Sequence, residues 1–220
     1  MKHKSIFIIV LLLCAVVATA QEQYNFVDLG LPSGTLWADR NLGASSPEDY
    51  GDYFAWGETS PKSNYEWSTY KYANGDKKSL TKYCSQSKYG DNGYTDRLTT
   101  LEGSDDAASA NLGSDWCMPT QAQFQELIDL CPCFWTTQNG KNGIYVRGRN
   151  GNSIFIPAAG VRVGADLKSA GASGLYWLSS LNESRPSNGC EFYFNSNGVS
   201  TNYYDYRFNG SSVRPVRCRK

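Results

Sequence analysis

The feature that most constrains the fold is a long stretch, residues 44–103, that lacks the hydrophobic periodicity of a helix or a strand. It is rich in Gly, Ser, Asn and Asp, and it holds eight tyrosines from Tyr50 to Tyr94. Loops of this length in a compact domain are usually functional or disordered. Disordered segments contain few aromatic residues, so we expect a long ordered loop held by a folded scaffold. Within this stretch, only residues 52–58, DYFAWGE, resemble a strand.

Short strand and helix patterns lie on either side of the loop. FVDLG (26–30) and TLWADRN (35–41) are strand-like runs with the turn sequence LPSG between them. After the loop, Ser104 has the residue type and position of a helix N-cap. Asp105 and Asp106 follow it, where the helix dipole favours negative charge. We therefore predict a first helix that begins after Ser104.

A second helix is predicted by a capping box and an apolar face. Thr120 and Gln123 have the T-x-x-Q spacing in which each side chain bonds the other residue's backbone. The apolar residues that follow with helical spacing are Phe124, Leu127, Ile128 and Cys131. These patterns predict a helix over residues 121–130.

Strand patterns dominate the rest of the chain. GIYVRG (143–148) and SIFIPAAG (153–160) flank Asn150-Gly151, a hairpin signal, and LYWLSS (175–180) reads as another strand. CEFYFN (190–195) alternates, with one face formed by Cys190, Phe192 and Phe194.

The chain then closes with a turn and a last strand. The turn is predicted at NSNG (195–198), through Asn197-Gly198, and SVRPVR (212–217) is the closing strand. Pro215 cannot donate a ladder hydrogen bond, so it is expected at a sheet edge or a bulge. Since no repeat or compositional break follows residue 20, we predict one α+β domain over residues 21–220.

The first twenty residues have the pattern of a secretory signal peptide. Lys2 and Lys4 precede an apolar run that ends in Ala18-Thr19-Ala20, a small-x-small cleavage pattern. The run is too short to span a membrane, and Cys14 falls inside it. We therefore expect residues 1–20 to be removed and the protein to be exported to the periplasm, the cell surface or the medium.

The cysteines of the mature chain are consistent with export. They are Cys84, Cys117, Cys131, Cys133, Cys190 and Cys218. An even number in an exported chain suggests disulfides, for which six cysteines allow 15 connectivities. Cys131 and Cys133 are too close to bond each other without strain. The sequence is compatible both with disulfides among the others and with buried free thiols.

Composition excludes several classes of function. The only histidine, His3, lies in the signal segment, which excludes Ser-His-Asp and Cys-His catalysis and histidine-ligated zinc in the mature protein. Without Lys2 and Lys4, 19 basic residues face 21 acidic ones, a net charge of −2. That balance lacks the electrostatic footprint of a nucleic-acid-binding protein. We expect no nucleic-acid partner, no membrane span and a monomer.

A set of motifs in fixed order resembles a known family. They are VDLGLPSGTLWADRNLGA, GDYFAWGE, LTKYC, DDAA, WCMPTQAQFQEL, NGNSIFIPAAGVR, GLYWLSS and SVRPVR. Together they resemble the Fibrobacter succinogenes major paralogous domain family of exported Bacteroidetes proteins, over residues 24–217.

The resemblance implies a C-type-lectin-like fold, similar to that of the formylglycine-generating enzymes. Such a fold is a small twisted, mostly antiparallel sheet with two helices and long ordered loops, and its terminal strands are neighbours. The chain departs from the family pattern at Cys117, where a basic residue is usual, and at Asp39 and Arg40. Cysteine pairing is therefore not carried over from the family.

Several residues have types that could serve catalysis or metal binding. The Glu-Pro-Asn, Gln-Pro-Asp and Trp-Asn-Asp motifs of calcium-dependent lectins are absent, and Asp105 with Asp106 is the best oxygen cluster. A reactive cysteine like that of the formylglycine-generating enzymes would have to be Cys190 or Cys218, next to Arg217. The acidic residues available for glycoside hydrolysis are Asp49, Asp52, Glu58, Asp91 and Asp96. A helix start, structural cysteines and solvated loop charges explain these residues better, so we expect no enzyme, metal or cofactor.

The segment near the C-terminus has the composition of a binding surface. Residues 179–212 hold six Asn, four Tyr and no Lys, and antibody loops favour Tyr, Ser, Gly and Asn for contact. The simpler explanation is that Tyr favours strands and Asn favours turns. The expected ligand-binding residues are Trp177, Tyr193, Asn202, Tyr203, Tyr204, Asp205, Tyr206 and Arg207. Part of the loop over residues 44–103 is expected to line the same face.

These observations predict an exported, non-enzymatic protein that binds a glycan or a surface protein. Two alternatives remain. One is a variable binding protein of the same fold, diversified by a retroelement, since adenine-directed mutation of asparagine codons gives the residue types of STNYYDYRFNGSS. The other is an enzyme like the formylglycine-generating group that uses a C-terminal cysteine.

Overall fold

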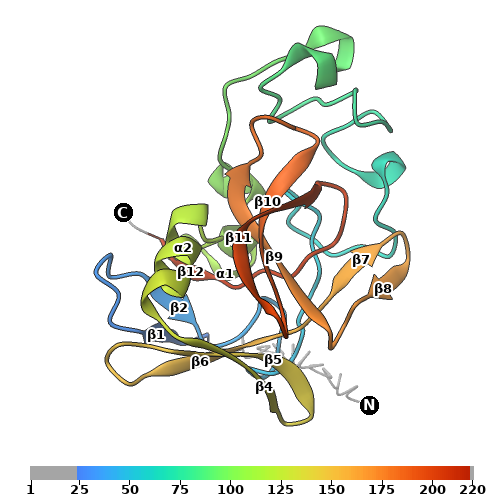
Figure 1. The fold of residues 1–220 in the computed structure, drawn as a ribbon. Helices are drawn as coiled ribbons and strands as arrows, with labels where there is room; N and C mark the ends of the chain where they lie inside the picture. The colour runs from blue at the N-terminus through green and yellow to red at the C-terminus, as the bar shows by residue number, and fades with distance from the viewer. Residues whose placement is uncertain (1–23, 219–220) are drawn as a thin grey trace, which may run out of the picture.

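The computed structural model describes residues 24–218, which form a mixed α+β structure with mostly antiparallel sheets and two α-helices (Figure 1). The expected signal peptide, residues 1–20, lies outside the described residues. The strands are β1 (Phe26–Asp28), β2 (Leu36–Ala38), β3 (Trp116–Cys117), β4 (Cys133–Gln138), β5 (Lys141–Arg147), β6 (Ser153–Pro157), β7 (Val161–Val163), β8 (Asp166–Lys168), β9 (Ser173–Leu181), β10 (Asn188–Asn195), β11 (Gly198–Tyr206) and β12 (Val216–Arg217). The helices are α1 (Ala107–Leu112) and α2 (Gln121–Leu130), with short 3₁₀ turns η1 (Trp67–Thr69), η2 (Ser87–Tyr89), η3 (Asp91–Gly93) and η4 (Gly103–Asp105).

The two ends of the described chain meet in one small sheet of order β1-β2-β12-β3. Val216 of β12 pairs with both Trp37 and Cys117. A disulfide joins Cys117 to Cys218, directly after β12. The neighbouring terminal strands are as expected. Pro215, however, lies immediately before β12, which is a central strand of this sheet, so the prediction that Pro215 lies at a sheet edge or a bulge is wrong. Because Pro215 lies outside the strand, its missing N–H removes no hydrogen bond from the ladder.

The second sheet, of order β11-β10-β9, packs against α2. Phe124 of the helix stacks on Phe192 of β10 with ring centroids 4.3 Å apart. Phe124 and Leu127 are buried, and the Thr120–Gln123 capping box is present at the start of the helix. The prediction of a helix over residues 121–130 is therefore confirmed.

Two further sheets complete the scaffold. Strands β4, β5 and β6 form an antiparallel sheet, and β7 pairs with β8. The β5–β6 turn contains Asn150-Gly151 as predicted, and Gly151 has a φ of 91° that suits glycine. The β10–β11 turn lies at NSNG (195–198) as predicted, but its central pair is one residue earlier than Asn197-Gly198. Asn195 pairs with Gly198, which leaves Ser196 and Asn197 as the turn.

The stretch over residues 44–103 is an ordered loop, as predicted. It contains short 3₁₀ turns but no long helix or strand, and Phe54 makes only an isolated bridge with Ser211. The expected strand over residues 52–58 is therefore wrong. In Figure 1 the part over residues 75–100 lies at one end of the molecule, with β4–β6 at the other.

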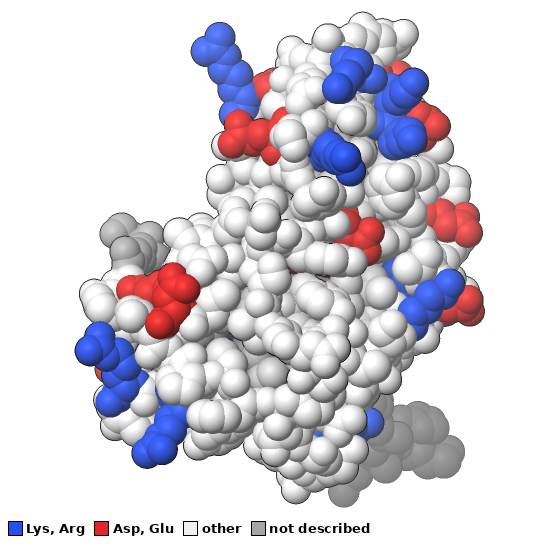
Figure 2. All heavy atoms as spheres, in the orientation of Figure 1, with Lys and Arg blue, Asp and Glu red and all other residues white. Residues whose placement is uncertain are grey.

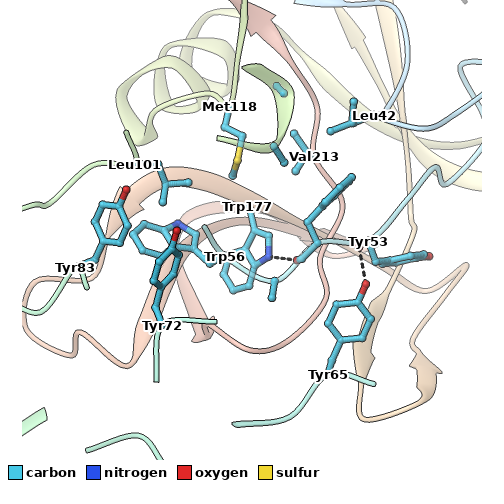
Figure 3. Packing of buried hydrophobic residues seen from close by; sticks show 14 of the residues in the cluster. Leu42, Tyr53, Trp56, Tyr65, Tyr72, Tyr83, Leu101, Met118, Trp177 and Val213 are labelled. Carbon is cyan, nitrogen blue, oxygen red and sulfur yellow. Dashed lines mark hydrogen bonds between the residues drawn. The ribbon is translucent and has the colours of Figure 1, made fainter. Parts of the chain in front are cut away.

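Aromatic residues with polar tips fasten this loop to the second sheet (Figure 3). Trp177 Nε1 donates to the Phe54 carbonyl at 2.6 Å, and Trp56 Nε1 donates to the Leu178 carbonyl at 2.8 Å. The Tyr65 hydroxyl donates to a carbonyl within the loop at 2.5 Å. Buried Trp and Tyr need such partners, so the aromatic content of the loop builds a core.

The first helix begins later than predicted. Ser104 lies in η4, and Asp106 is the N-cap of α1, accepting the Ser109 N–H at 3.0 Å. The same carboxylate accepts the Met118 N–H at 2.8 Å, which ties the helix start to the segment after β3. That second bond, from a distant residue, explains why the cap falls on Asp106.

Candidate functional site

The predicted binding residues lie mainly on β11, an edge strand of its sheet. The β10–β11 register breaks between Ser200 and Tyr203, so Thr201 and Asn202 together oppose Phe192. Such a bulge re-aims the side chains that follow it. Thr201 is buried against α2 through its bond to Gln125, whereas Asn202 is exposed.

Beyond the bulge, the pleat of β11 divides the tyrosines between two faces. Tyr203 pairs with Glu191 and Tyr204 pairs with Cys190. Successive side chains of a strand point to opposite sides. Tyr203 and Tyr204 are each 40% exposed. The tyrosines of β11 therefore form two small surfaces, one on each face of the strand.

The face that carries Tyr203 also carries Tyr193. Their rings stack with centroids 4.8 Å apart, and the Tyr193 hydroxyl accepts a hydrogen bond from Asn195 at 2.8 Å. Asp205 is half-buried on the same side of the strand. Stacked rings with polar groups at their margins suit the apolar face of a sugar or a partner's side chain.

The opposite face and the end of β11 carry Tyr204 and Tyr206. The Arg185 guanidinium lies 5.6 Å from the Tyr204 ring centroid. Tyr206, 39% exposed, stacks on Phe208 at 5.5 Å and meets the edge of Trp67 at 5.9 Å. Because Trp67 belongs to η1, the long loop does contribute to this surface.

A basic cleft of about 440 Å³ lies beside Tyr206. Its cationic lining residues are Lys77, Lys78, Lys88 and Arg185, and its aromatic ones are Tyr89 and Tyr206. All four cations are exposed, and none of the lining residues is acidic. Figure 2 shows basic side chains gathered at the upper right of the molecule.

Two of the predicted site residues are in the core, and their assignment is corrected. Trp177 has no exposed surface, since the loop covers it through the bond to Phe54. Arg207 also has none; it donates to the carbonyls of Lys82, Tyr83 and Pro186. Neither side chain belongs to an exposed binding surface.

Glu191 of β10 has an unusual environment. It is fully buried, its Oε1 accepts the Ser211 hydroxyl at 2.5 Å, and its Oε2 has no hydrogen-bond partner. Burial raises the pKa of this carboxyl well above its usual value, and the nearby Asp205 carboxyl raises it further. Glu191 therefore holds its proton more tightly than an ordinary glutamate.

The cysteines considered for catalysis have structural environments. Cys218 is in the disulfide with Cys117. Burial raises the pKa of the Cys190 thiol to about 11, and the carboxylates of Glu191 and Glu183 add to this effect. A reactive thiol needs the reverse, a lowered pKa in an electropositive setting.

The acidic residues considered for calcium are held by protein donors. Asp106 caps α1, and Asp105 accepts bonds from Lys82 at 2.6 Å and from the Tyr83 hydroxyl at 2.8 Å. Burial alone would raise the pKa of Asp105, but hydrogen bonds from Lys82, Tyr72 and Tyr83 lower it to about 2. Within residues 24–218, no cluster of three or more Cys, His, Asp or Glu side chains is arranged to hold a metal.

Four of the five acids considered for glycoside hydrolysis are engaged by nearby groups, and one of these, Asp91, accepts a bond from Asn74 at 3.0 Å. Asp49 accepts the Ser45 hydroxyl, Glu58 pairs with Lys62, and Asp96 accepts the Tyr83 and Cys84 N–H groups. These contacts agree with the interpretation that the acidic residues are loop charges and turn caps.

No protein-family model, curated protein or solved structure matches this chain. Among the described helices, none has the length and apolar character required to cross a membrane. The sequence analysis did not predict the basic cleft, because Arg185 is about one hundred residues from the three lysines in the chain. Only the fold brings them together.

Proposed function

We propose that this chain is an exported, non-enzymatic ligand-binding protein of C-type-lectin-like fold. The ligand is a glycan or a surface protein, bound at β11. The proposed binding residues are Tyr193, Asn202, Tyr203, Tyr204, Asp205 and Tyr206. The observation that carries the proposal is the exposure of three tyrosines within four residues on an edge strand, beside a cleft.

The architecture supports the finer fold assignment. Its terminal strands are neighbours in one sheet, it has two α-helices, and a long ordered loop covers a small antiparallel sheet. These are the properties that the family resemblance implied. Export is supported by the Cys117–Cys218 disulfide, since such bonds persist in oxidising compartments.

The structural settings of the cysteines argue against the enzyme alternative. The thiol of Cys218 is consumed in the disulfide, and the raised pKa of Cys190 disfavours its thiolate. One observation favours diversification by a retroelement: Asn202, Tyr203, Tyr204 and Tyr206 are all exposed, so they tolerate replacement without loss of the core. A neighbouring reverse transcriptase gene and a template copy that differs only at adenines are the genomic test.

The binding proposal is tested on glycan and protein arrays. The mature wild type is compared with the triple variant Tyr203→Ala, Tyr204→Ala, Tyr206→Ala. The matched control removes three other exposed apolar side chains, through Leu130→Ala, Phe134→Ala and Leu167→Ala. We expect the wild type and the control to bind the same ligands and the tyrosine variant to lose them. Equal binding by all three proteins rejects this surface, and no binding by the wild type rejects the function.

A further inference from the structure

The basic cleft beside Tyr206 contains cations without acidic partners. Three lysines elsewhere within residues 24–218 pair with carboxylates: Lys62 with Glu58 at 2.9 Å, Lys71 with Asp105 at 3.5 Å and Lys82 with Glu102 at 2.5 Å. In the described part of the chain, Lys77, Lys78, Lys88 and Arg185 form no ion pair. Four like charges in one cleft repel one another, so an anion that enters it lowers the electrostatic energy.

Aromatic rings hold two of these cations and leave their N–H donors available. The Lys88 ammonium lies 5.1 Å from the Tyr89 ring centroid, and the Arg185 guanidinium lies 5.6 Å from that of Tyr204. Such cation–π contacts position a charge without neutralising it. The charged groups therefore remain free to bond carboxylate or sulfate oxygens.

The backbone on either side of Arg185, which forms one wall of the cleft, is held by hydrogen bonds to its carbonyl groups. Buried Arg207 donates to the Pro186 carbonyl at 2.9 Å. The Glu183 carbonyl accepts bonds from the Ser85 hydroxyl at 2.9 Å and from Gln86 at 2.8 Å. Because its backbone is already held in place, this wall loses little entropy when a ligand binds.

The remaining lining suits a sugar. Tyr89 and Tyr206 offer ring surface. Ser187 and Asn188 place small polar groups in the lining; both residues are buried, and the Ser187 hydroxyl donates to Asn188 Oδ1 at 2.9 Å, which leaves the Asn188 amide N–H groups as the donors. A cleft with anion-binding cations, aromatic rings and small polar groups matches the three parts of an acidic sugar: its charge, its apolar face and its hydroxyls.

We propose that the cleft formed by Lys77, Lys78, Lys88 and Arg185 with Tyr89 and Tyr206 binds the acidic sugar units of a carboxylated or sulfated glycan. This inference rests on the proposed function, and it names the ligand class for the same surface. Arg185 and Tyr206 connect the cleft to the tyrosines of β11.

The test measures binding of the mature protein to polygalacturonate and hyaluronan as carboxylated probes, chondroitin sulfate and heparin as sulfated probes, and dextran as a neutral probe. The cleft variant is Lys77→Gln, Lys78→Gln, Lys88→Gln. The matched control, Arg147→Gln, Arg149→Gln, Lys168→Gln, removes the same charge at exposed positions elsewhere. A single Arg185→Gln variant tests the fixed wall, and equal Tm values establish that every variant is folded.

We expect the wild type and the control to bind at least one acidic probe within twofold of each other and not to bind dextran. The cleft variant and Arg185→Gln should bind that probe at least tenfold more weakly. Whichever group of acidic probes binds more tightly, the carboxylated or the sulfated, identifies the charged group of the ligand.

Three outcomes overturn the inference: no acidic probe binds, the cleft variant binds like the control, or a single-stranded oligonucleotide binds as tightly as the best glycan. If the wild type instead binds a neutral glycan or a protein through the β11 tyrosines, the proposed function stands and only the inference falls. If no array ligand binds at all, both fall.

Discussion

At the scale of single residues, buried Glu191 is the group with the clearest measurable consequence. Its carboxyl group accepts one bond from Ser211, and no cation pairs with it among residues 24–218. In the unfolded chain it titrates like an ordinary glutamate, near pH 4.3. Because burial raises its pKa in the folded state, the folded protein binds this proton more tightly than the unfolded chain. Folding is therefore favoured most by this group below its unfolded pKa, and that advantage is lost as the pH rises through the folded pKa.

We predict that Glu191→Gln increases stability at neutral pH. The amide has the shape of the protonated acid and carries no charge, so folding no longer requires this side chain to take up a proton or to bury a charge. The Tm difference between the variant and the wild type should be small at pH 4.5 and should grow steadily up to pH 8, as measured by differential scanning calorimetry. Exposed Glu183→Gln is the control and should show no such trend. A Tm difference that stays constant with pH would show that Glu191 ionises normally.

At the scale of elements, the long loop and β11 are joined through Arg207. The guanidinium donates to the Tyr70 hydroxyl at 2.8 Å and to the carbonyls of Lys82 and Tyr83 at 3.0 Å each. It also stacks over Trp56, 5.0 Å from the ring centroid. A residue expected from the sequence to bind ligand instead satisfies buried loop carbonyls, which would otherwise lack donors.

We predict that Arg207→Lys destabilises the protein although it conserves the charge. Lysine lacks the planar five-donor fork, so it leaves two or three of these acceptors without a partner. The expected loss is about 2–4 kcal/mol of unfolding free energy, measured by urea denaturation. The same exchange at Arg217, which is exposed, should change stability by less than about 0.5 kcal/mol. A variant at position 207 with wild-type stability would contradict the anchoring role.

Elements whose signals are local could be predicted from the sequence, and those set by distant partners could not. The capping box placed α2 correctly because its bonds lie within four residues. The N-cap of α1 is Asp106 and not the predicted Ser104, because the N–H of Met118, twelve residues further along the chain, also donates to the Asp106 carboxylate. The composition of β11 indicated exposed tyrosines, but the bulge opposite Phe192, and hence the face of each ring, depends on pairing with β10. Trp177 was misassigned because nothing local shows that Phe54 covers it.

At the scale of the whole molecule, the Cys117–Cys218 disulfide closes the fold. The bonded residues are 101 positions apart, and they join the segments that hold β12 in the terminal sheet. β12 contributes only two residues to that sheet, although Val216 is buried in the core. A cross-link over so long a loop mainly restricts the unfolded chain, with an expected effect of roughly 3–5 kcal/mol.

We predict that Cys117→Ser, Cys218→Ser and the double variant lose nearly the same stability, because each removes the same bond. Urea denaturation should give a loss of roughly 3–5 kcal/mol for each, and dithiothreitol should lower the wild type to the level of the double variant. Cys133→Ser is the control, since Cys133 is a free thiol, and reductant should destabilise it as much as the wild type. Alkylation of the denatured, unreduced mature protein should modify four thiols, Cys84, Cys131, Cys133 and Cys190. Modification of all six would show that the terminal sheet is closed by strand pairing alone, and the single variants would then retain wild-type stability.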